Sequence, residues 1–410
     1  MEFDVYTNGA TLTWEQVFEA PETSYVLLDI REEDQLHYGV VTGAKNEPLS
    51  LFSGYQGGKE IKKEKQEELL KRITMYASGR PVCVLCKSGI KSRPVVDWLI
   101  ENGLTAFEME GGYDAYVLFM FAREDAQSEE VKKKHSKEIE ASIRKKFHRS
   151  IFSRFTKAIN TYELVKPGDK IAVCISGGKD SMLMAKCFQE LKRHNKFPFE
   201  LVFLCMDPGY NPANRQIIED NARILDIPLT FFKTDIFDTV YDIPKSPCYL
   251  CARMRRGHLY SKAKELGCNK IALGHHYDDV IETILMGMLY GAQVQTMMPK
   301  LHSTNFEGME LIRPLYLVRE DDIKAWRDYN NLHFLQCACR FTETCTTCSD
   351  EGTSNSARLS VKKLIREMKK TNEFVESNIF NSVENVNLST VIAYKKDGVR
   401  HSFLDDYDKE

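Results

Sequence analysis

The chain has 410 residues, which is long enough for two or three domains that each bury a core of their own. Its hydrophobic fraction of 43% and charged fraction of 28% are typical of globular proteins, and no apolar run approaches the ~18 residues of a membrane span. The net charge of −3 gives no general attraction to nucleic acid, so contact with RNA needs a local basic surface. The N-terminal sequence MEFDVYTNGA lacks the basic start of a signal peptide. We therefore expect a cytoplasmic protein with no membrane partner.

Two apolar segments, residues 25–31 and 81–85, predict buried strands in a small N-terminal α/β domain. The second segment leads directly into the loop Cys86-Lys-Ser-Gly-Ile-Lys-Ser. A thiol at the start of a helix is stabilised as a thiolate by the surrounding N–H groups, and Lys87 and Lys91 add positive charge. Phosphatases with a similar loop need an arginine where this chain has Ser92, so the spacing favours sulfur chemistry over phosphate chemistry.

The same segment carries Asp29-Ile30-Arg31 and, near its end, Gly111-Gly112-Tyr113. With these motifs, residues 1–125 resemble a rhodanese domain. The resemblance implies that Cys86 is the catalytic cysteine and carries sulfur as a persulfide. A rhodanese-like module that serves only for protein contacts is the alternative, and the presence of Cys86 argues against it.

Residues 126–150 are predicted to form a basic helical linker. Apolar residues recur at every fourth position from Ile139 to Phe155, which indicates an amphipathic helix with one apolar seam. Two roles stay open for this helix, a surface that binds RNA and a solvated connection. The basic residues along it are Lys132, Lys133, Lys134, Lys137, Arg144, Lys145, Lys146, Arg149, Arg154 and Lys157.

A third apolar segment, residues 171–175, predicts a buried strand that ends in a glycine-rich turn before a helix. Such a turn directs backbone N–H groups and the positive end of the helix at one point, where an anion can bind. The spacing is not that of a Walker loop. It resembles the PP-loop of ATP pyrophosphatases, which implies that ATP is a cofactor and that Asp180 is catalytic. The residues of this motif are Ser176, Gly177, Gly178, Lys179, Asp180 and Ser181.

Further strands are predicted at residues 200–206, 229–233 and from Lys270, with helices between them. This alternation predicts a doubly wound parallel sheet that binds ligands at the carboxyl ends of its strands. We expect Asp207 to be catalytic there, and Gly274 and the pair Asp278 and Asp279 to bind the cofactor. The two carboxylates suit Mg²⁺ beside a nucleotide, although one of them could instead cap the following helix. His275 and His276 are expected to be pocket walls or core residues.

Two cysteines in Pro247-Cys-Tyr-Leu-Cys251 can bind one metal centre if they lie at a turn. Together with Gly274-His-His-Tyr-Asp-Asp, Met298-Pro-Lys-Leu, Ile312-Arg-Pro-Leu and Cys337, this motif closely resembles the tRNA 2-thiocytidine synthetases. The resemblance covers about residues 144–390. It implies a 4Fe-4S cluster held by Cys248, Cys251 and Cys337, and basic contacts to phosphates from Arg253, Arg255, Arg256 and Arg313.

The resemblance further implies a tRNA substrate whose cytidine 32 is adenylated at the C2 oxygen and then thiolated, with release of AMP and pyrophosphate. Sulfur would come from a cysteine desulfurase or another donor, with a relay through Cys86, and the relatives suggest a homodimer. Two alternatives stay open: thiolation of another tRNA base to 2-thiouridine, and a metal-binding redox sensor with a rhodanese docking module. The intact phosphate-binding motif argues against the sensor.

Several cysteine assignments also stay open. Cys339 could replace Cys337 as the third cluster ligand. Two Cys-x-x-Cys pairs, Cys248 with Cys251 and Cys345 with Cys348, could instead bind a structural zinc, or the second pair could relay persulfide or be surface thiols. Cys174, Cys187 and Cys205 lie in apolar runs and are expected in the core. The predicted organisation is a rhodanese-like domain (1–125), the linker (126–150), a PP-loop tRNA thiolation domain (151–396) and an acidic tail (397–410).

Overall fold

The computed structural model describes residues 6–33, 35–52, 63–194, 197–234, 247–334 and 357–405, together with Phe3, Ile236 and Tyr407. The chain forms two compact units. The first comprises Met1–His276 and Pro299–Ser354, and the second comprises Tyr277–Met298 and Asn355–Glu410. Within the described residues, no helix is long and apolar enough to cross a membrane.

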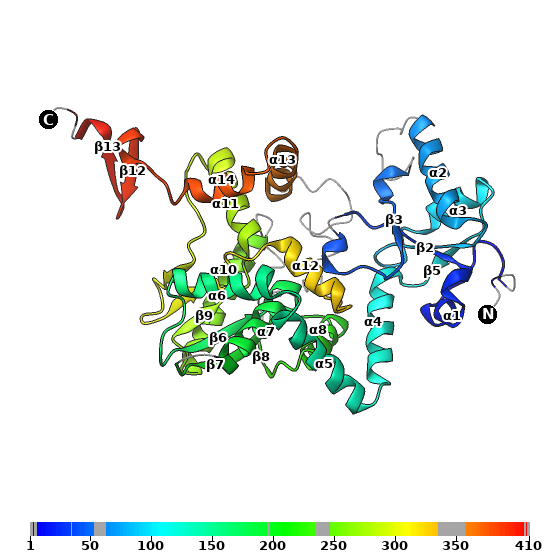
Figure 1. Ribbon diagram of the computed structural model, residues 1–410, viewed down its shortest axis with the longest axis horizontal. Coiled ribbons are helices and arrows are strands. Elements are labelled where there is room, and N and C mark those ends of the chain that lie inside the picture. Colours follow the sequence, from blue (N-terminus) through cyan, green and yellow to red (C-terminus); the bar gives the residue numbers. More distant parts are fainter. Residues whose placement is uncertain are drawn as a thin grey trace. The chain divides into compact units, whose positions relative to one another are not determined.

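The N-terminal part of the first unit is built on a five-stranded sheet in which every neighbouring pair is parallel (Figure 1). The strand order is β1-β5-β4-β2-β3. Strands β2 and β4 are buried along their whole length, as their continuous apolar sequences predict. The strands are β1 (Thr11–Leu12), β2 (Val26–Asp29), β3 (Lys45–Asn46), β4 (Val82–Leu85) and β5 (Ala106–Met109).

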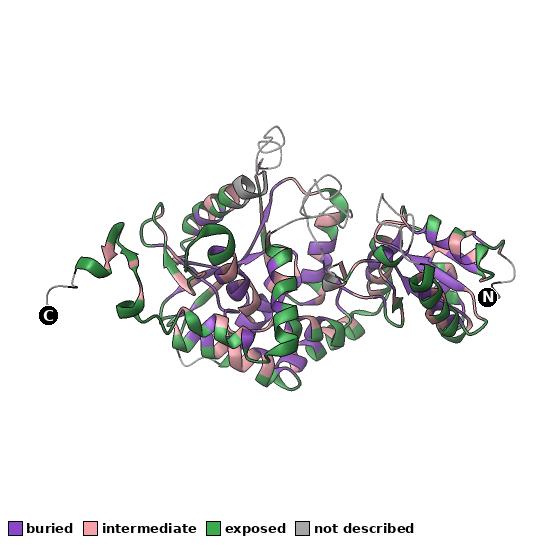
Figure 2. Ribbon diagram, turned by 90° about the horizontal axis from the view of Figure 1, so that it is seen from above, coloured by how far each residue is buried: buried purple, intermediate pink, exposed green. Residues whose placement is uncertain are grey.

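Helices cover both faces of this sheet, because successive side chains of a buried strand point to opposite faces. Leu28 and Val84 pack with α2 and α3, whereas Leu27 and Leu85 pack with α1 and α4. The strands are largely buried and the outer helix faces exposed (Figure 2). The helices are α1 (Trp14–Glu19), α2 (Lys63–Ala77), α3 (Arg93–Glu101) and α4 (Gly112–Asp125).

A six-stranded sheet forms the second core of the first unit. Its order is β10-β11-β9-β6-β7-β8, and all neighbours are parallel except β10 and β11. Helix α10 packs on one face. The strands are β6 (Lys170–Ile175), β7 (Glu200–Asp207), β8 (Leu229–Lys233), β9 (Lys270–Ala272), β10 (Lys300–His302) and β11 (Glu310–Ile312), and the helices are α7 (Lys179–His194), α8 (Pro212–Ile224), α10 (Pro247–Glu265) and α12 (Glu320–Tyr329).

Strand β6 lies at the point where the strand order of this sheet reverses, with β7 on one side and β9 on the other. In open α/β sheets, ligands bind outside the carboxyl end of the strands at such a point. The loop at residues 176–181, which we call the phosphate loop, follows β6 there. Both sheets confirm the predicted α/β class, with a parallel N-terminal sheet and a doubly wound second sheet.

The predicted linker at residues 126–150 folds as helix α5 (Glu129–Arg144) and the start of a π-helical turn (His148–Phe152), and α6 (Ser153–Thr161) follows it. Its apolar seam is buried, as the fourfold spacing predicts. Ion pairs then fix α5 to α7, because Glu140 lies 2.9 Å from Lys186 Nζ and 2.7 Å from Arg193 Nη1, and Arg144 lies 3.2 Å from Glu190. The C-terminal half of α5 is therefore packed on the domain of the second sheet.

The second unit contains three helices that contact one another and a two-stranded hairpin. Tyr277 and Phe380 stack with ring centroids 4.6 Å apart. The predicted acidic tail from residue 397 begins instead with a hairpin turn, because Asp397 and Gly398 both adopt positive φ and join the strands. The elements are α11 (Tyr277–Gly291), α13 (Ala357–Thr371), α14 (Val375–Ser382), β12 (Ala393–Lys396) and β13 (Val399–Ser402).

Candidate functional site

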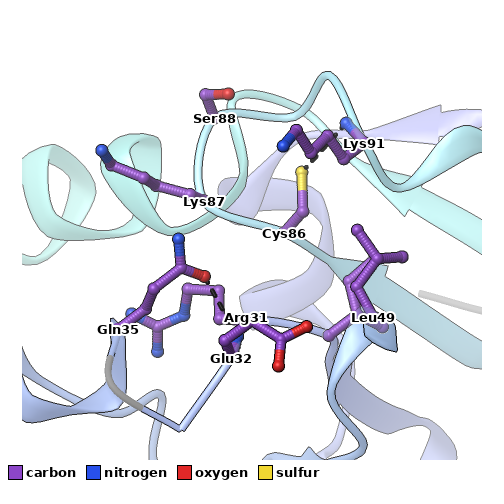
Figure 3. Close-up of a pocket in the computed structure, with 9 residues that line it drawn as sticks. Arg31, Glu32, Gln35, Leu49, Cys86, Lys87, Ser88 and Lys91 are labelled. Carbon is purple, nitrogen blue, oxygen red and sulfur yellow. Dashed lines mark hydrogen bonds between the residues drawn. The ribbon is translucent and has the colours of Figure 1, made fainter. Parts of the chain in front are cut away.

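The loop at residues 86–92, which we call the cysteine loop, connects β4 to α3 and folds around the sulfur of Cys86. The backbone N–H of Lys91 donates to Cys86 Sγ at 3.3 Å (Figure 3). Ser92 Oγ lies 3.6 Å from the same sulfur and donates its own proton to Glu108 Oε1 at 2.8 Å. The hydroxyl oxygen is therefore oriented to accept a proton from the thiol. Cys86 itself is 4% exposed, so only a small opening leads to the sulfur.

Glycines allow helix α4 to close directly on this loop. The backbone N–H of Tyr113 donates to the Cys86 carbonyl and that of Asp114 to the Lys87 carbonyl, both at 2.9 Å. A Cβ atom at Gly112 would overlap the Cys86 carbonyl oxygen, and both Gly111 and Gly112 have positive φ. The Gly111-Gly112-Tyr113 motif thus holds the cysteine loop through backbone contacts.

A cavity of about 20 Å³ opens beside Cys86. It is large enough for about one water-sized group, which matches the outer sulfur of a persulfide. In Figure 3, Arg31, Glu32 and Gln35 lie across the pocket from the cysteine loop. Arg31 is fixed by Asp29, whose Oδ2 accepts from Arg31 Nη2 at 2.6 Å in a buried pair. The remaining lining residues are Ile30, Leu49, Lys87, Ser88 and Lys91.

The phosphate loop is held by its own serines. The backbone N–H of Ser176 donates to Ser181 Oγ at 3.1 Å, and Ser181 Oγ donates to the Gly178 carbonyl at 3.0 Å. Gly177 has a φ of 85°, a conformation that few other residues adopt. Helix α7 begins two residues later at Lys179, so its N-terminus faces the loop. This is the geometry of an anion site.

The charges at this loop suit phosphate together with a cation. Lys179 is 4% exposed, and its Nζ lies 3.2 Å from Asp180 Oδ2 and 3.5 Å from Glu320 Oε1. Asp180 Oδ1 is buried, makes no hydrogen bond within the described residues and lies 3.9 Å from His276 Nε2. Glu320 was missed by the sequence analysis, since an acidic residue at the start of a helix is explained by the helix dipole alone.

Gly274 and His276 lie against the phosphate loop. A Cβ atom at Gly274 would lie 3.1 Å from the Ser181 nitrogen and 3.2 Å from the Asp180 carbonyl carbon, which is tighter than ordinary contact. Glycine therefore lets the segment after β9 approach the loop. His276 is 7% exposed, in agreement with its prediction as a wall or core residue.

Asp207 ends strand β7 at the same edge of the sheet, where it organises the following turn. Its Oδ1 accepts from the N–H groups of Gly209 at 3.0 Å and Tyr210 at 2.8 Å, and its Oδ2 accepts from Arg215 at 2.8 Å. Burial raises the pKa of Asp207, but these donors outweigh burial and lower it overall. Asp207 is thus an ionised carboxylate that stabilises a turn, and a catalytic role stays a prediction.

Asp278 and Asp279 lie in the first turn of α11 in the second unit. Asp279 Oδ1 accepts from Arg358 Nη1 at 3.2 Å, and Arg358 Nε also lies 3.5 Å from Glu282. The first-turn position is the one that favours acidic residues through the helix dipole. The role of this pair as magnesium ligands stays a prediction.

Six of the twelve cysteines have side chains that the structure describes, and all six are buried. Cys174, Cys187 and Cys205 are buried as predicted, and burial raises their pKa values, to about 12 for Cys174 and Cys205. Cys83 and Cys268 are buried as well. Cys248 and Cys251 lie in helix α10, which begins at Pro247 where the sequence had suggested a turn, since proline is favoured in the first helical turn.

The predicted cluster ligands themselves lie beyond what the structure describes. The side chains of Cys248 and Cys251, and the whole of Cys337, Cys339, Cys345 and Cys348, are outside the described residues. Among the described side chains, no group of three or more His, Cys, Asp or Glu residues is arranged to hold a metal ion.

The domain comparisons match the two sheets. The model of a PP-loop domain matches residues 143–339, and that of a rhodanese-like domain matches residues 14–118. Among solved structures, the chain is similar to the U34-tRNA thiolase NcsA from Methanococcus maripaludis with its [4Fe-4S] cluster (TM-score 0.45, 20% identity, 57% of this chain and 79% of that one). It is also similar to a rhodanese-related protein from Thermoplasma volcanium (TM-score 0.21, 21% identity, 26% of this chain and 90% of that one).

Relatives named tRNA-cytidine(32) 2-sulfurtransferase match over more than half of the chain. The one from Citrifermentans bemidjiense is 35% identical over 240 residues, which are 58% of this chain and 90% of the relative. The one from Syntrophotalea carbinolica is 34% identical over 233 residues, which are 56% of this chain and 86% of the relative. The chain therefore belongs to the tRNA-cytidine(32) 2-sulfurtransferase family and carries a rhodanese-like domain in addition to its PP-loop domain.

Proposed function

We propose that this protein is an ATP-dependent tRNA sulfurtransferase that converts a cytidine, at position 32 as in its relatives, to 2-thiocytidine. The observation that carries the proposal is the phosphate loop, with its buried Lys179 and the N-terminus of α7, in a chain of this family. The loop fits the pyrophosphate portion of ATP in both charge and backbone geometry.

The chemistry requires two displacements. The C2 oxygen of the cytidine attacks the α-phosphorus of ATP, so that a new P–O bond forms while the bond to the β-phosphate bridge breaks and pyrophosphate leaves. Hydrosulfide then adds to C2, the C2–O bond breaks, AMP leaves and the sulfur loses its proton. Lys179 and the N–H groups of the phosphate loop would stabilise the charge that develops on the leaving pyrophosphate.

Mg²⁺ and a cluster complete the proposal. Asp278 and Asp279 are its magnesium ligands, because carboxylates are the ligands that Mg²⁺ prefers. Cys248, Cys251 and Cys337 would hold a 4Fe-4S cluster, and this donor set of three thiols fits one. Held by these three thiolates, such a cluster would supply an iron site for binding sulfide.

Cys86 would deliver the sulfur. A cysteine desulfurase loads the outer sulfur onto Cys86, and an acceptor thiolate then attacks that sulfur. The new S–S bond forms as the persulfide bond breaks, and Cys86 leaves as a thiolate, so that this transfer needs no oxidant or reductant. A second thiolate then attacks the inner sulfur of the acceptor persulfide, hydrosulfide leaves, and an external thiol reductant reduces the disulfide that remains. The cavity beside Cys86 supports this role, because it has space for the outer sulfur and little else.

The test is thiolation of unmodified tRNA by the anaerobically purified chain with ATP, Mg²⁺ and sulfide, followed by mass spectrometry of the nucleosides. We expect 2-thiocytidine with release of AMP and pyrophosphate, and a loss of about 100-fold or more for Lys179→Ala. Lys192→Ala is the matched control, because Lys192 is an exposed residue on the same helix.

The products separate the alternatives. The appearance of 2-thiouridine would transfer the proposal to another base, and the absence of any thiolated nucleoside with the fully loaded protein would overturn it. Equal activity of Lys179→Ala and Lys192→Ala would remove the phosphate loop from the mechanism.

A further inference from the structure

A buried polar seam joins the rhodanese-like domain to the PP-loop domain within the first unit. Tyr113 Oη lies 3.3 Å from His333 Nδ1, and the rings of Tyr116 and His333 meet edge to face at 5.2 Å. Gly39 lies at the same point, since a Cβ atom there would overlap Tyr113 Oη. Tyr113 and His333 are each only 5% exposed, so this contact is inside the molecule.

Tyr113 also belongs to the cysteine loop. Its backbone N–H donates to the Cys86 carbonyl at 2.9 Å, and its ring lies beneath the guanidinium of Arg31, with 3.7 Å between Arg31 Cζ and the ring centroid. Arg31 in turn lines the cavity beside Cys86. Tyr113 therefore contacts the cysteine loop through its backbone, and the wall of the cavity and the other domain through its side chain.

Both partners of this hydrogen bond are uncharged. Burial raises the pKa of the Tyr113 hydroxyl, so the hydroxyl stays protonated. Burial, followed by the charges of Arg327 and Arg31, lowers the pKa of His333 to about 3, so the imidazole is neutral. Tyr113 Oη and His333 Nδ1 thus share a hydrogen bond between two neutral groups, and the tautomer of His333 sets which of them donates.

The PP-loop domain fixes His333 from the opposite side. Asn221 Nδ2 of helix α8 donates to the His333 carbonyl at 2.9 Å. His333 Nε2 and Asn221 Oδ1 have no hydrogen-bond partner among the described residues, and their side chains line a cavity of about 40 Å³. This cavity is large enough for water, which would satisfy both atoms.

Contacts of the linker helix and of α8 limit the movement of the rhodanese-like domain away from the PP-loop domain. Helix α5 is fixed to α7 through Glu140 and Arg144, and the core that contains Trp14 and Tyr116 also includes Ile217 of α8. Undocking would remove Ile217 from this core and expose the seam. We propose that the rhodanese-like domain hands on its sulfur while docked, and that Tyr113 and His333 are the positioning pair that aims the cysteine loop at the PP-loop domain.

This inference rests on the proposed function, and its test separates the two. The full chain is loaded with persulfide at Cys86, and the loss of the outer sulfur from the Cys86 peptide is followed by mass spectrometry together with 2-thiocytidine formation. Tyr113→Phe removes only the hydroxyl, and His333→Leu removes its hydrogen-bond partner. We expect both to slow sulfur loss and persulfide-driven thiolation about tenfold, the value of about one lost hydrogen bond.

Two activities should stay within about twofold of wild type in both variants: sulfide-driven thiolation and transfer of sulfur from thiosulfate to cyanide at Cys86. His333→Asn, which keeps an acceptor near the position of Nδ1, should restore most of the lost rate. Wild-type sulfur loss in Tyr113→Phe and His333→Leu would overturn the inference, and so would an equal fall in sulfide-driven thiolation. If wild type forms no thiolated nucleoside with sulfide, the proposed function fails, while sulfur loss from the Cys86 peptide still decides the role of the pair.

Discussion

The approach of helix α4 to the cysteine loop depends on the absence of a Cβ atom at two glycines. The N–H groups of Tyr113 and Asp114 reach the carbonyls of Cys86 and Lys87 only because Gly112 has no side chain there. Gly89 on the loop is equally constrained, since its Cβ would lie 2.7 Å from the Gly111 nitrogen. The conformation of the cysteine loop is therefore determined by backbone packing.

We predict that Gly112→Ala lowers the transfer of sulfur from thiosulfate to cyanide about 100-fold. The added Cβ would overlap the Cys86 carbonyl oxygen, so the cysteine loop must shift to make room for it. The activity is measured by thiocyanate formation. Gly257→Ala is the control, since Gly257 lies in helix α10 with open space around its Cβ position. Full activity of Gly112→Ala would show that the close approach does not hold the loop.

At the scale of elements, the packing of helix α5 decides which of its basic residues are paired with carboxylates and which remain exposed. Arg144 pairs with Glu190, and the carboxylate of Glu140 binds Lys186, whose side chain is 1% exposed. Ion pairs between helices thus neutralise part of the positive charge of this segment, for example at Arg144. The exposed remainder, such as Lys133 and Lys137, still leaves room for RNA contact.

Glu140 should make stability depend on pH. Burial raises its pKa, but the hydrogen bonds from Arg193 and Lys186 outweigh burial and lower it from 4.5 to about 2. The unfolded state therefore binds the proton first, and the contribution of Glu140 is fully present above about pH 4.5 and is lost as the pH falls toward 2.

We predict that Glu140→Gln lowers the free energy of unfolding by about 3 kcal/mol at pH 7, because it leaves Lys186 buried without its partner charge. The same variant should show a weaker loss of stability between pH 4.5 and 2 than wild type. Urea titrations at several pH values measure both effects. Glu129→Gln serves as control, since this exposed pair with Lys132 contributes at most about 1 kcal/mol.

Some elements were predictable from local pattern, and others were not. The strand predicted at residues 229–233 is β8, because a short apolar run with turn signals on both sides has few other structures. The hairpin at β12 and β13 was missed although Asp397-Gly398 is a strong turn signal, since the acidic residues that follow dominated the composition. Glu320 was missed for a different reason, because its partner Lys179 is distant in sequence.

At the scale of the whole molecule, the cysteines divide according to their surroundings. Cys83, Cys174, Cys187, Cys205 and Cys268 are buried in the two cores, where burial raises their pKa values and makes them poor nucleophiles. Cys86 is also buried, but its side chain lines a cavity. Of the proposed cluster ligands, Cys337 is distant in sequence from Cys248 and Cys251. Cluster binding would therefore require the fold to bring these two segments together.

We predict about four iron atoms and matching acid-labile sulfide per anaerobically purified chain, as a 4Fe-4S cluster requires. Cys337→Ala should lose the iron, and Cys348→Ala should keep it, because Cys348 is not among the proposed ligands. Iron, sulfide and zinc are determined on the same samples. One zinc without iron, lost on Cys348→Ala, would contradict the cluster and favour a site built from the two Cys-x-x-Cys pairs.

The sequence by itself determined the two α/β domains, the phosphate loop after β6, the cysteine loop after β4 and the burial of the core thiols, because each depends on residues that are neighbours in the chain. Only the tertiary structure decided that Glu320 shares Lys179, that Asp207 stabilises a turn through Arg215, and that Tyr113 meets His333. The roles of these residues depend on their burial and on their distance from a partner in another segment. Neither quantity is encoded in local spacing, since both arise when separate segments pack together.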